Sequence, residues 1–159
     1  CGIRMGAWVC KNQSVKESVM KFCQARLSPP LIGQVIAEAS IDTPAEYMQE
    51  MYNEYLERRN YLIEGLNKIP GVYSAVPMGA FYTVARLPID DSDKFCAWLL
   101  SEFEYEKQTV MMAPASGFYT MKNVGCNEVR LAYVLNKEDL EKALFILKKA
   151  LEVYPGRTK

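Results

Sequence analysis

One long helical pattern, bounded by clear start and stop signals, constrains the fold of this 159-residue chain more than any other feature. At its start, Thr43 can cap a helix, Pro44 suits the first helical turn, and Glu46 can complete a capping box. At its end, Pro70-Gly71 stops the pattern. The apolar stripe between these signals consists of Tyr47, Met51, Tyr55, Leu62 and Leu66. We therefore expect two domains, with one boundary at the start of this helix: residues 1–41 and residues 42–159.

After Gly71 the apolar residues follow the alternating and short-run patterns that are typical of strands. We expect strands at residues 72–76, 79–87, 109–112 and 128–134. A helix should begin at Asp90-Asp91-Ser92, and Asn136 should cap a final helix. Strands and helices in this order predict an α/β chain whose second domain is a two-layer α+β domain, with a mixed sheet and flanking helices.

The first 41 residues do not form a closed unit of their own in this pattern. The apolar run Met5 to Val9 predicts a buried strand, and the spacing from Ser14 to Arg26 predicts a helix. Ser28-Pro29-Pro30 breaks that helix, because neither proline can donate a backbone hydrogen bond, and an apolar helix follows at residues 31–39. We expect this segment to be the trailing edge, one strand and its helices, of another and larger domain.

Composition excludes several kinds of function. The chain has no histidine, which removes Ser-His-Asp and Cys-His nucleophile systems and histidine metal sites. Lysine plus arginine equals aspartate plus glutamate, so no basic surface for nucleic acid is expected. No apolar run approaches the roughly 20 residues that a bilayer span requires, so no membrane partner is expected. The five cysteines include no C-x-x-C pair, which argues against a zinc site and for reduced thiols in the cytoplasm.

Two arginines are candidates for binding an anion. Arg4 lies between two glycines in Gly2-Ile3-Arg4-Met5-Gly6, where another backbone or a ligand can approach closely. Arg130 lies among apolar residues of the last expected strand, where burial without an anionic partner is costly. On local sequence alone a structural ion pair is the simpler explanation of Arg4. A position on an edge strand, with the guanidinium in water, would likewise explain Arg130.

The chain resembles the fold-type I pyridoxal-phosphate-dependent aminotransferases of classes I and II, the group that includes aspartate aminotransferase. In that family a glycine-flanked arginine follows the cofactor lysine by eight residues, as Gly2-Ile3-Arg4-Met5-Gly6 would. The small domain of the family starts with a long helix, here residues 43–68, and continues through a Gly-Ala-Phe-Tyr strand, here residues 79–82. It ends with an arginine-bearing strand, here residues 127–131, after a Pro-Gly-x-x-Phe loop that residues 113–119 resemble.

This resemblance implies a role for each arginine and for each domain. Arg4 would bind the phosphate of pyridoxal 5'-phosphate, and Arg130 would bind the α-carboxylate of an amino-acid substrate. Residues 1–41 would be the edge of the cofactor-binding domain, and residues 42–159 would be the small domain. The parent would be a homodimeric, cytoplasmic transaminase acting on amino acids and 2-oxo acids. Its cofactor lysine would precede Cys1 by five residues, so this chain alone should neither retain the cofactor nor turn over substrate.

The substrate and the bond that is broken stay open. In one aspartate-using subgroup an arginine follows Pro-Pro-x-x-Gly by two residues and binds the distal carboxylate, whereas this chain has Val35 there. A lyase of the same fold that catalyses β-elimination would use the same arginines. The effector-binding domain of a transcription regulator built on this fold, or an unrelated α+β domain, would also fit parts of the pattern.

Overall fold

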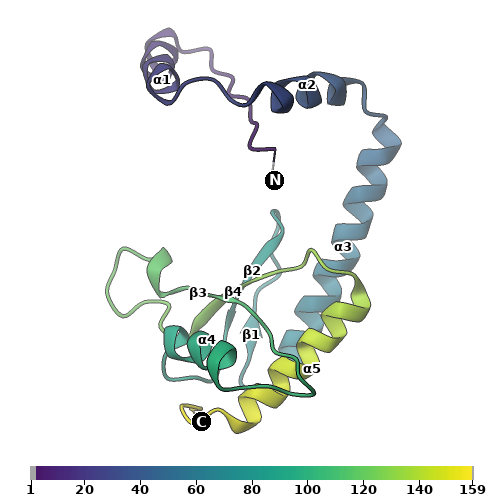
Figure 1. The fold of residues 1–159 in the computed structure, drawn as a ribbon, viewed down its shortest axis with the longest axis vertical. Coiled ribbons are helices and arrows are strands. Elements are labelled where there is room, and N and C mark those ends of the chain that lie inside the picture. Colours follow the sequence, from purple (N-terminus) through teal and green to yellow (C-terminus); the bar gives the residue numbers. More distant parts are fainter. Residues whose placement is uncertain (1–2, 159) are drawn as a thin grey trace. The chain divides into compact units, whose positions relative to one another are not determined.

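The computed structural model describes residues 3–158, which divide into two compact units, Cys1–Gln49 and Glu50–Lys159. The boundary falls inside the long helix α3 (Ala45–Asn67), labelled in Figure 1. This helix starts directly after Pro44 and ends shortly before Pro70, which confirms the start and stop signals in the sequence.

The first unit contains two short α-helices, of which the first has a side-chain cap. Helix α1 (Gln13–Arg26) begins after Asn12, whose side-chain oxygen accepts a hydrogen bond of 3.1 Å from the Val15 amide. Helix α2 (Leu31–Ala39) follows the two prolines and continues into the 3-10 turn η1 (Ser40–Asp42). The buried strand expected at Met5 to Val9 is not found, because this stretch is exposed and forms no strand. A strand requires a neighbour for its backbone groups, and none of the described residues provides one.

The second unit is built on a four-stranded sheet of order β1-β2-β4-β3. The strands are β1 (Tyr73–Ser74), β2 (Tyr82–Arg86), β3 (Ala113–Pro114) and β4 (Glu128–Ala132). All three described pairings are antiparallel, whereas we expected a mixed sheet. Apolar alternation determines which residues face the core but says nothing of the direction of the neighbouring strand. The stretch 109–112, expected as a strand, instead leads into β3, and the Thr109 hydroxyl donates to the Leu99 carbonyl at 2.6 Å.

Two further helices complete the second unit, and both begin where the sequence predicts, each with a side-chain cap. Asp91 accepts a hydrogen bond of 3.0 Å from the Lys94 amide at the start of α4 (Ser92–Ser101). Asn136 accepts one of 2.8 Å from the Asp139 amide at the start of α5 (Lys137–Val153). Each cap satisfies one of the amides that a helix leaves unpaired at its first turn.

The core of the second unit lies between one face of the sheet and the helices α3, α4 and α5. One connected group of buried side chains joins the sheet to all three helices. Its members include Ala85 and Val129 from the sheet, Leu62 and Leu66 from α3, Phe95 and Leu99 from α4, and Leu140, Leu147 and Leu151 from α5. This arrangement confirms the α/β class and the two layers of the second unit.

The opposite face of the sheet is open. Along β2, Thr83 and Ala85 are buried while Tyr82, Val84 and Arg86 are exposed. Along β4, Val129 is buried and Arg130 is exposed. This two-residue period is that of a strand with one covered and one uncovered face. Among residues 3–158, no helix has both the length and the apolar character that crossing a bilayer requires.

Candidate functional site

Arg130 lies on the open face of the sheet, at the centre of strand β4. Its Cα is paired with Val84 on one side and with Ala113 on the other. Strand β4 is therefore an interior strand, so the edge-strand explanation of Arg130 is wrong. The side chain nevertheless reaches the surface, because residue 130 falls on the uncovered side of the strand.

The Arg130 guanidinium lies over two aromatic rings. Its central carbon is 4.9 Å from the centroid of Tyr82 and 5.1 Å from that of Phe118. Within the described part of the chain, no carboxylate forms an ion pair with Arg130. The rings attract the cation through their negative faces but accept none of its N–H bonds in the way that a carboxylate does. The site is therefore cationic and has no counter-ion among residues 3–158.

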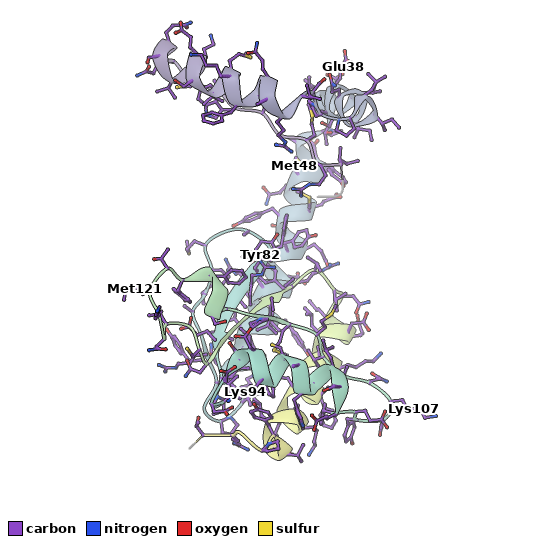
Figure 2. The ribbon with its side chains drawn as sticks, turned by 60° about the vertical axis from the view of Figure 1, so that its left-hand side comes forward. Glu38, Met48, Tyr82, Lys94, Lys107 and Met121 are labelled. Carbon is purple, nitrogen blue, oxygen red and sulfur yellow. The ribbon has the colours of Figure 1, made fainter. Side chains whose placement is uncertain are left out.

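Phe118 reaches this position through an anchored loop. It ends the 3-10 turn η2 (Ser116–Phe118), where its amide donates to the Ala115 carbonyl at 2.9 Å. The Ala115 amide donates to the Glu128 carbonyl at 2.9 Å, which continues the pairing of β3 with β4. The Ser116 hydroxyl donates to the Asp93 carboxylate at 2.5 Å, so the turn is also attached to α4. Figure 2 shows Met121 beyond this turn, on the exposed part of the loop.

Tyr119 and Gly125 fix the other end of the same loop. The Tyr119 hydroxyl donates to the Glu128 carboxylate, and this bond to an anion raises the pKa of Tyr119 above its ordinary value. Gly125 has a φ of +74°, and a Cβ built there would lie 2.4 Å from the Tyr119 ring. Only glycine suits both the left-handed backbone and the close ring.

Arg4 belongs to the first unit and is exposed, with a left-handed φ of 55°. It lines a hollow of about 790 Å³ in that unit. The other lining residues are Gly6, Met20, Cys23, Gln24, Arg26, Leu27, Ser28, Pro29 and Pro30. No carboxylate is among them, and no ion pair of Arg4 occurs within residues 3–158, which argues against the structural ion pair. Two guanidinium groups with polar Gln24 and Ser28 fit a phosphate group well.

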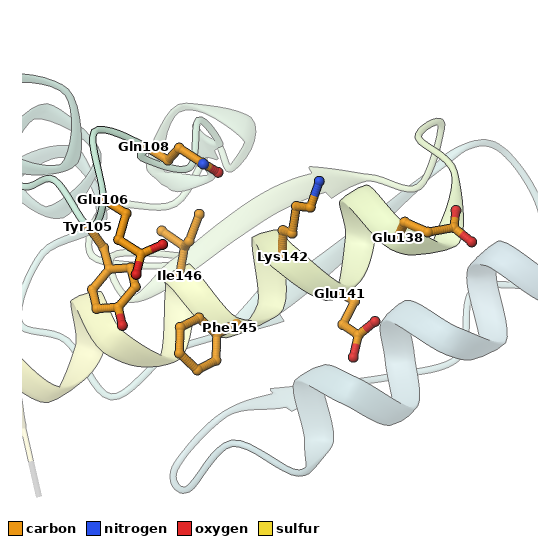
Figure 3. Close-up of a pocket in the computed structure, with 8 residues that line it drawn as sticks. All are labelled: Tyr105, Glu106, Gln108, Glu138, Glu141, Lys142, Phe145 and Ile146. Atoms are coloured by element: carbon orange, nitrogen blue, oxygen red, sulfur yellow. The ribbon is translucent and has the colours of Figure 1, made fainter.

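A second hollow, of about 400 Å³, lies beside α5 and has a different character (Figure 3). The rings of Tyr105 and Phe145 meet there edge to face, with centroids 5.4 Å apart. The polar lining is Glu106, Gln108, Glu138, Glu141 and Lys142. Carboxylates predominate in this hollow and no arginine lines it, so its chemistry differs from that of both arginine sites.

Sequence reasoning identified Arg4 and Arg130 but missed the two rings that contact Arg130. In the sequence, Tyr82 belongs to the Gly-Ala-Phe-Tyr motif and Phe118 to the loop at residues 113–119, and neither pattern predicts a contact with Arg130. The alternation of buried and exposed residues could have indicated that Tyr82 lies near Arg130, because residues on one face of the paired strands β2 and β4 are neighbours. No local signal could have indicated Phe118, since its position depends on the anchoring of the loop to α4 and β4.

This fold has clear relatives among known proteins. The model of the family "Aminotransferase class I and II" matches residues 1–147. The chain therefore belongs to the class I and II aminotransferases.

Individual relatives agree with this assignment. Aspartate aminotransferase of Pyrococcus horikoshii is 32% identical over 161 residues, with 95% of this chain and 38% of the relative covered. Aspartate aminotransferase of Rhizobium meliloti is 30% identical, with 90% of this chain and 35% of the relative covered. The chain thus spans little more than a third of the length of these relatives.

Solved structures show the same fold. Alanine aminotransferase from Pyrococcus furiosus superposes with a TM-score of 0.67 at 27% identity, covering 87% of this chain and 35% of that one. Aspartate aminotransferase from Thermotoga maritima gives a TM-score of 0.68 at 28% identity, covering 87% of this chain and 33% of that one. These similar proteins are named for different amino acids, alanine in one case and aspartate in the others.

Proposed function

We propose that this chain is the carboxy-terminal part of an amino-acid aminotransferase. The whole enzyme would transfer an amino group between an amino acid and a 2-oxo acid with pyridoxal 5'-phosphate. The observation that carries this proposal is the exposed, unpaired guanidinium of Arg130 on an interior strand. A charge that no carboxylate of the described chain neutralises is suited to a carboxylate that arrives with the substrate.

In this proposal Arg130 binds the α-carboxylate of the substrate. A guanidinium offers two parallel N–H bonds to a planar carboxylate, which fixes the orientation of the ligand as well as its affinity. Holding one end of the amino acid in this way positions its Cα for reaction. Closure of residues 42–159, the small domain, onto the substrate through Arg130 would also exclude water.

Arg4 would bind the phosphate of the cofactor. Support comes from its exposed position in a hollow that Arg26, Gln24 and Ser28 also line, without a carboxylate. Pyridoxal phosphate, when bound, supplies the electron sink that makes exchange of the amino group possible. Residues 1–41 would then be the edge of the cofactor-binding domain.

Two further features of the parent belong to the same proposal. The parent would be a homodimer, as the family resemblance implies, and the exposed Leu31, Ile32 and Val35 of α2 would contact the rest of that protein. Location in the cytoplasm is supported by the cysteines at positions 10, 23, 96 and 126, which form no disulfide within residues 3–158.

The first test uses the protein that carries this chain together with its preceding residues. The codon five positions before that of Cys1 should encode the lysine that binds the cofactor. Incubation with a panel of amino acids and 2-oxoglutarate should then yield glutamate. Pyruvate and ammonia without glutamate would instead identify a lyase, and binding without turnover would indicate a sensing domain.

The second test uses Arg130→Ala in that protein. We expect the KM for the amino acid to rise on the order of 100-fold, because two charge-assisted hydrogen bonds are lost. Cofactor absorbance should persist, since Arg130 is assigned to the substrate. Loss of the cofactor with an unchanged KM would contradict this assignment. Arg4→Ala serves as the opposite control, in which affinity for the cofactor should fall.

A further inference from the structure

We propose that Tyr82 and Phe118 are positioning residues, which hold the Arg130 guanidinium between them so that its N–H edge stays free for the substrate carboxylate. This inference rests on the function proposed above for Arg130. It adds that the affinity of the carboxylate site depends on two aromatic side chains that lie beside the arginine.

The register of the sheet brings the two rings to Arg130 from different sides. Tyr82 lies on β2, paired with Ala132, and is therefore the diagonal neighbour of Arg130 on the open face. Phe118 follows β3, the neighbour of β4 on its other side. The facing residues Val84 and Ala113 are small enough to leave the space above β4 to the guanidinium.

Stacking on rings restricts the cation without occupying its hydrogen-bond donors. A guanidinium is planar, with five N–H bonds around its edge, whereas a ring interacts with the cation through its π face. A carboxylate takes its two hydrogen bonds in the plane of the guanidinium. Rings over the cation are therefore compatible with a carboxylate at its edge, and neither partner has to displace the other.

Two other arginines of the second unit differ from Arg130. One has its guanidinium edge occupied by hydrogen bonds, and the other lies over a single ring. Arg58 also lies near a ring, that of Tyr55, but its edge is occupied by the Glu54 carboxylate at 2.7 Å and by the Val134 carbonyl at 2.6 Å. Arg86 lies over the single ring of Tyr73, at 5.8 Å. Within residues 50–158, Arg130 alone lies over two rings.

An arginine held in this way loses less freedom when the ligand arrives. A free arginine side chain has many rotamers, and binding a carboxylate requires it to select one. Two rings that already limit the guanidinium reduce this ordering cost, which is the general benefit of preorganisation. Their removal should therefore weaken ground-state binding of the carboxylate and leave the chemical step nearly unchanged.

The kinetic experiment uses the whole enzyme with the amino acid that it turns over best and 2-oxoglutarate. Tyr82→Leu and Phe118→Leu should each raise the KM for the amino acid by about fivefold, with kcat changed less than twofold. Tyr82→Phe keeps the ring and should restore the original KM. Tyr73→Leu is the matched control, because its ring is exposed on the same sheet but lies over Arg86. A KM unchanged in both leucine variants would overturn the inference.

A second measurement does not depend on enzymatic activity. In the NMR spectrum of the 159-residue chain labelled with ¹⁵N, the Nε–H proton of Arg130 should be shifted upfield by the two rings. The shift should shrink in Tyr82→Leu and in Phe118→Leu but persist in Tyr73→Leu. An Arg130 resonance at its random-coil position in the unsubstituted chain would overturn the inference.

The KM of a further variant, Arg130→Lys, separates this inference from the proposed function. If Arg130→Lys leaves the KM unchanged, the carboxylate assignment fails whatever the rings do. If Arg130→Lys raises the KM but both leucine variants behave like the unsubstituted enzyme, only the positioning role fails.

Discussion

The two units of this chain differ in how far their apolar side chains are buried. In the first unit, Gly33 is the only buried residue among residues 3–49, and Leu31 and Ile32 of α2 are 74% and 75% exposed. In the second unit, side chains such as Leu66, Phe95 and Leu99 are completely buried in a common core. The first unit has helices without a core, whereas the second has both.

This difference separates two causes of structure. Local signals specify helices in both units, since Asn12 and Asn136 cap α1 and α5 with the same type of hydrogen bond. Within residues 3–158, extensive burial of apolar surface, which provides most of the stability of a fold, occurs only in the second unit. We therefore expect the second unit to unfold cooperatively and the first to contribute little to that transition.

The largest expected effect comes from truncating one leucine in each unit. Leu99→Ala should lower the free energy of unfolding by about 2–5 kcal/mol, because it leaves a cavity in a packed core. Leu31→Ala removes the same atoms from an exposed position and should change it by about 0.5 kcal/mol or less. Urea unfolding followed by circular dichroism measures both. Equal losses of unfolding free energy in the two variants would contradict the difference between the units, because they would reveal a stabilising environment around α2.

A glycine-to-alanine substitution in each unit compares how tightly the backbone is constrained in the two units. Gly125→Ala should cost about 1–3 kcal/mol, since the position has a φ of +74° and a Cβ would press on the Tyr119 ring. Gly6→Ala in the first unit meets no atom within 4 Å and should cost about 0.5 kcal/mol or less. Thermal unfolding of both variants provides the measurement. A neutral Gly125→Ala would show that the loop before β4 can relax.

Alkaline pH should weaken the second unit through Tyr154. Burial, with a hydrogen bond of 3.0 Å to Asp90 as a further cause, raises the pKa of Tyr154 to about 12. Because this value exceeds the ordinary 10, the stabilisation is complete below pH 10 and is lost as the pH rises towards 12. By pH 11 the loss should be on the order of 1 kcal/mol.

The control for this effect is Tyr154→Phe, which cannot ionise. The difference in unfolding free energy between the unsubstituted chain and this variant should stay constant from pH 7 to 9 and shrink above pH 10. A difference that does not change with pH would show that Tyr154 ionises equally in the folded and unfolded chains.

The sequence was a good guide wherever structure depends on neighbours along the chain. Thr43-Pro44, Asp91 and Asn136 indicated the starts of α3, α4 and α5, because capping involves residues only three or four positions apart. It was a poor guide at residues 5–9 and 109–112, which have strand-like composition but form no strand. A strand depends on a partner that is distant in sequence, and composition does not reveal whether one is present.

The same distinction applies to the candidate site. Arg130 could be identified because a charge amid apolar strand residues is conspicuous in the sequence. The contact between Arg130 and Phe118 could not be identified from the sequence. The position of the Phe118 ring depends on hydrogen bonds that join Ser116 to Asp93 and Ala115 to Glu128. The antiparallel direction of β4 was equally absent from the sequence pattern.

The alternation of buried and exposed residues in β2 and β4 has a consequence for how this protein can change over generations. Val129 and Ala85 are constrained by the packed core, whereas Arg130, Val84 and Tyr82 face outwards. Under the proposed role of Arg130, selection for folding and selection for ligand preference would act on alternate positions of the same strands. New ligand preferences can be acquired by replacing outward residues one at a time, without the compensating substitutions that a packed interior demands.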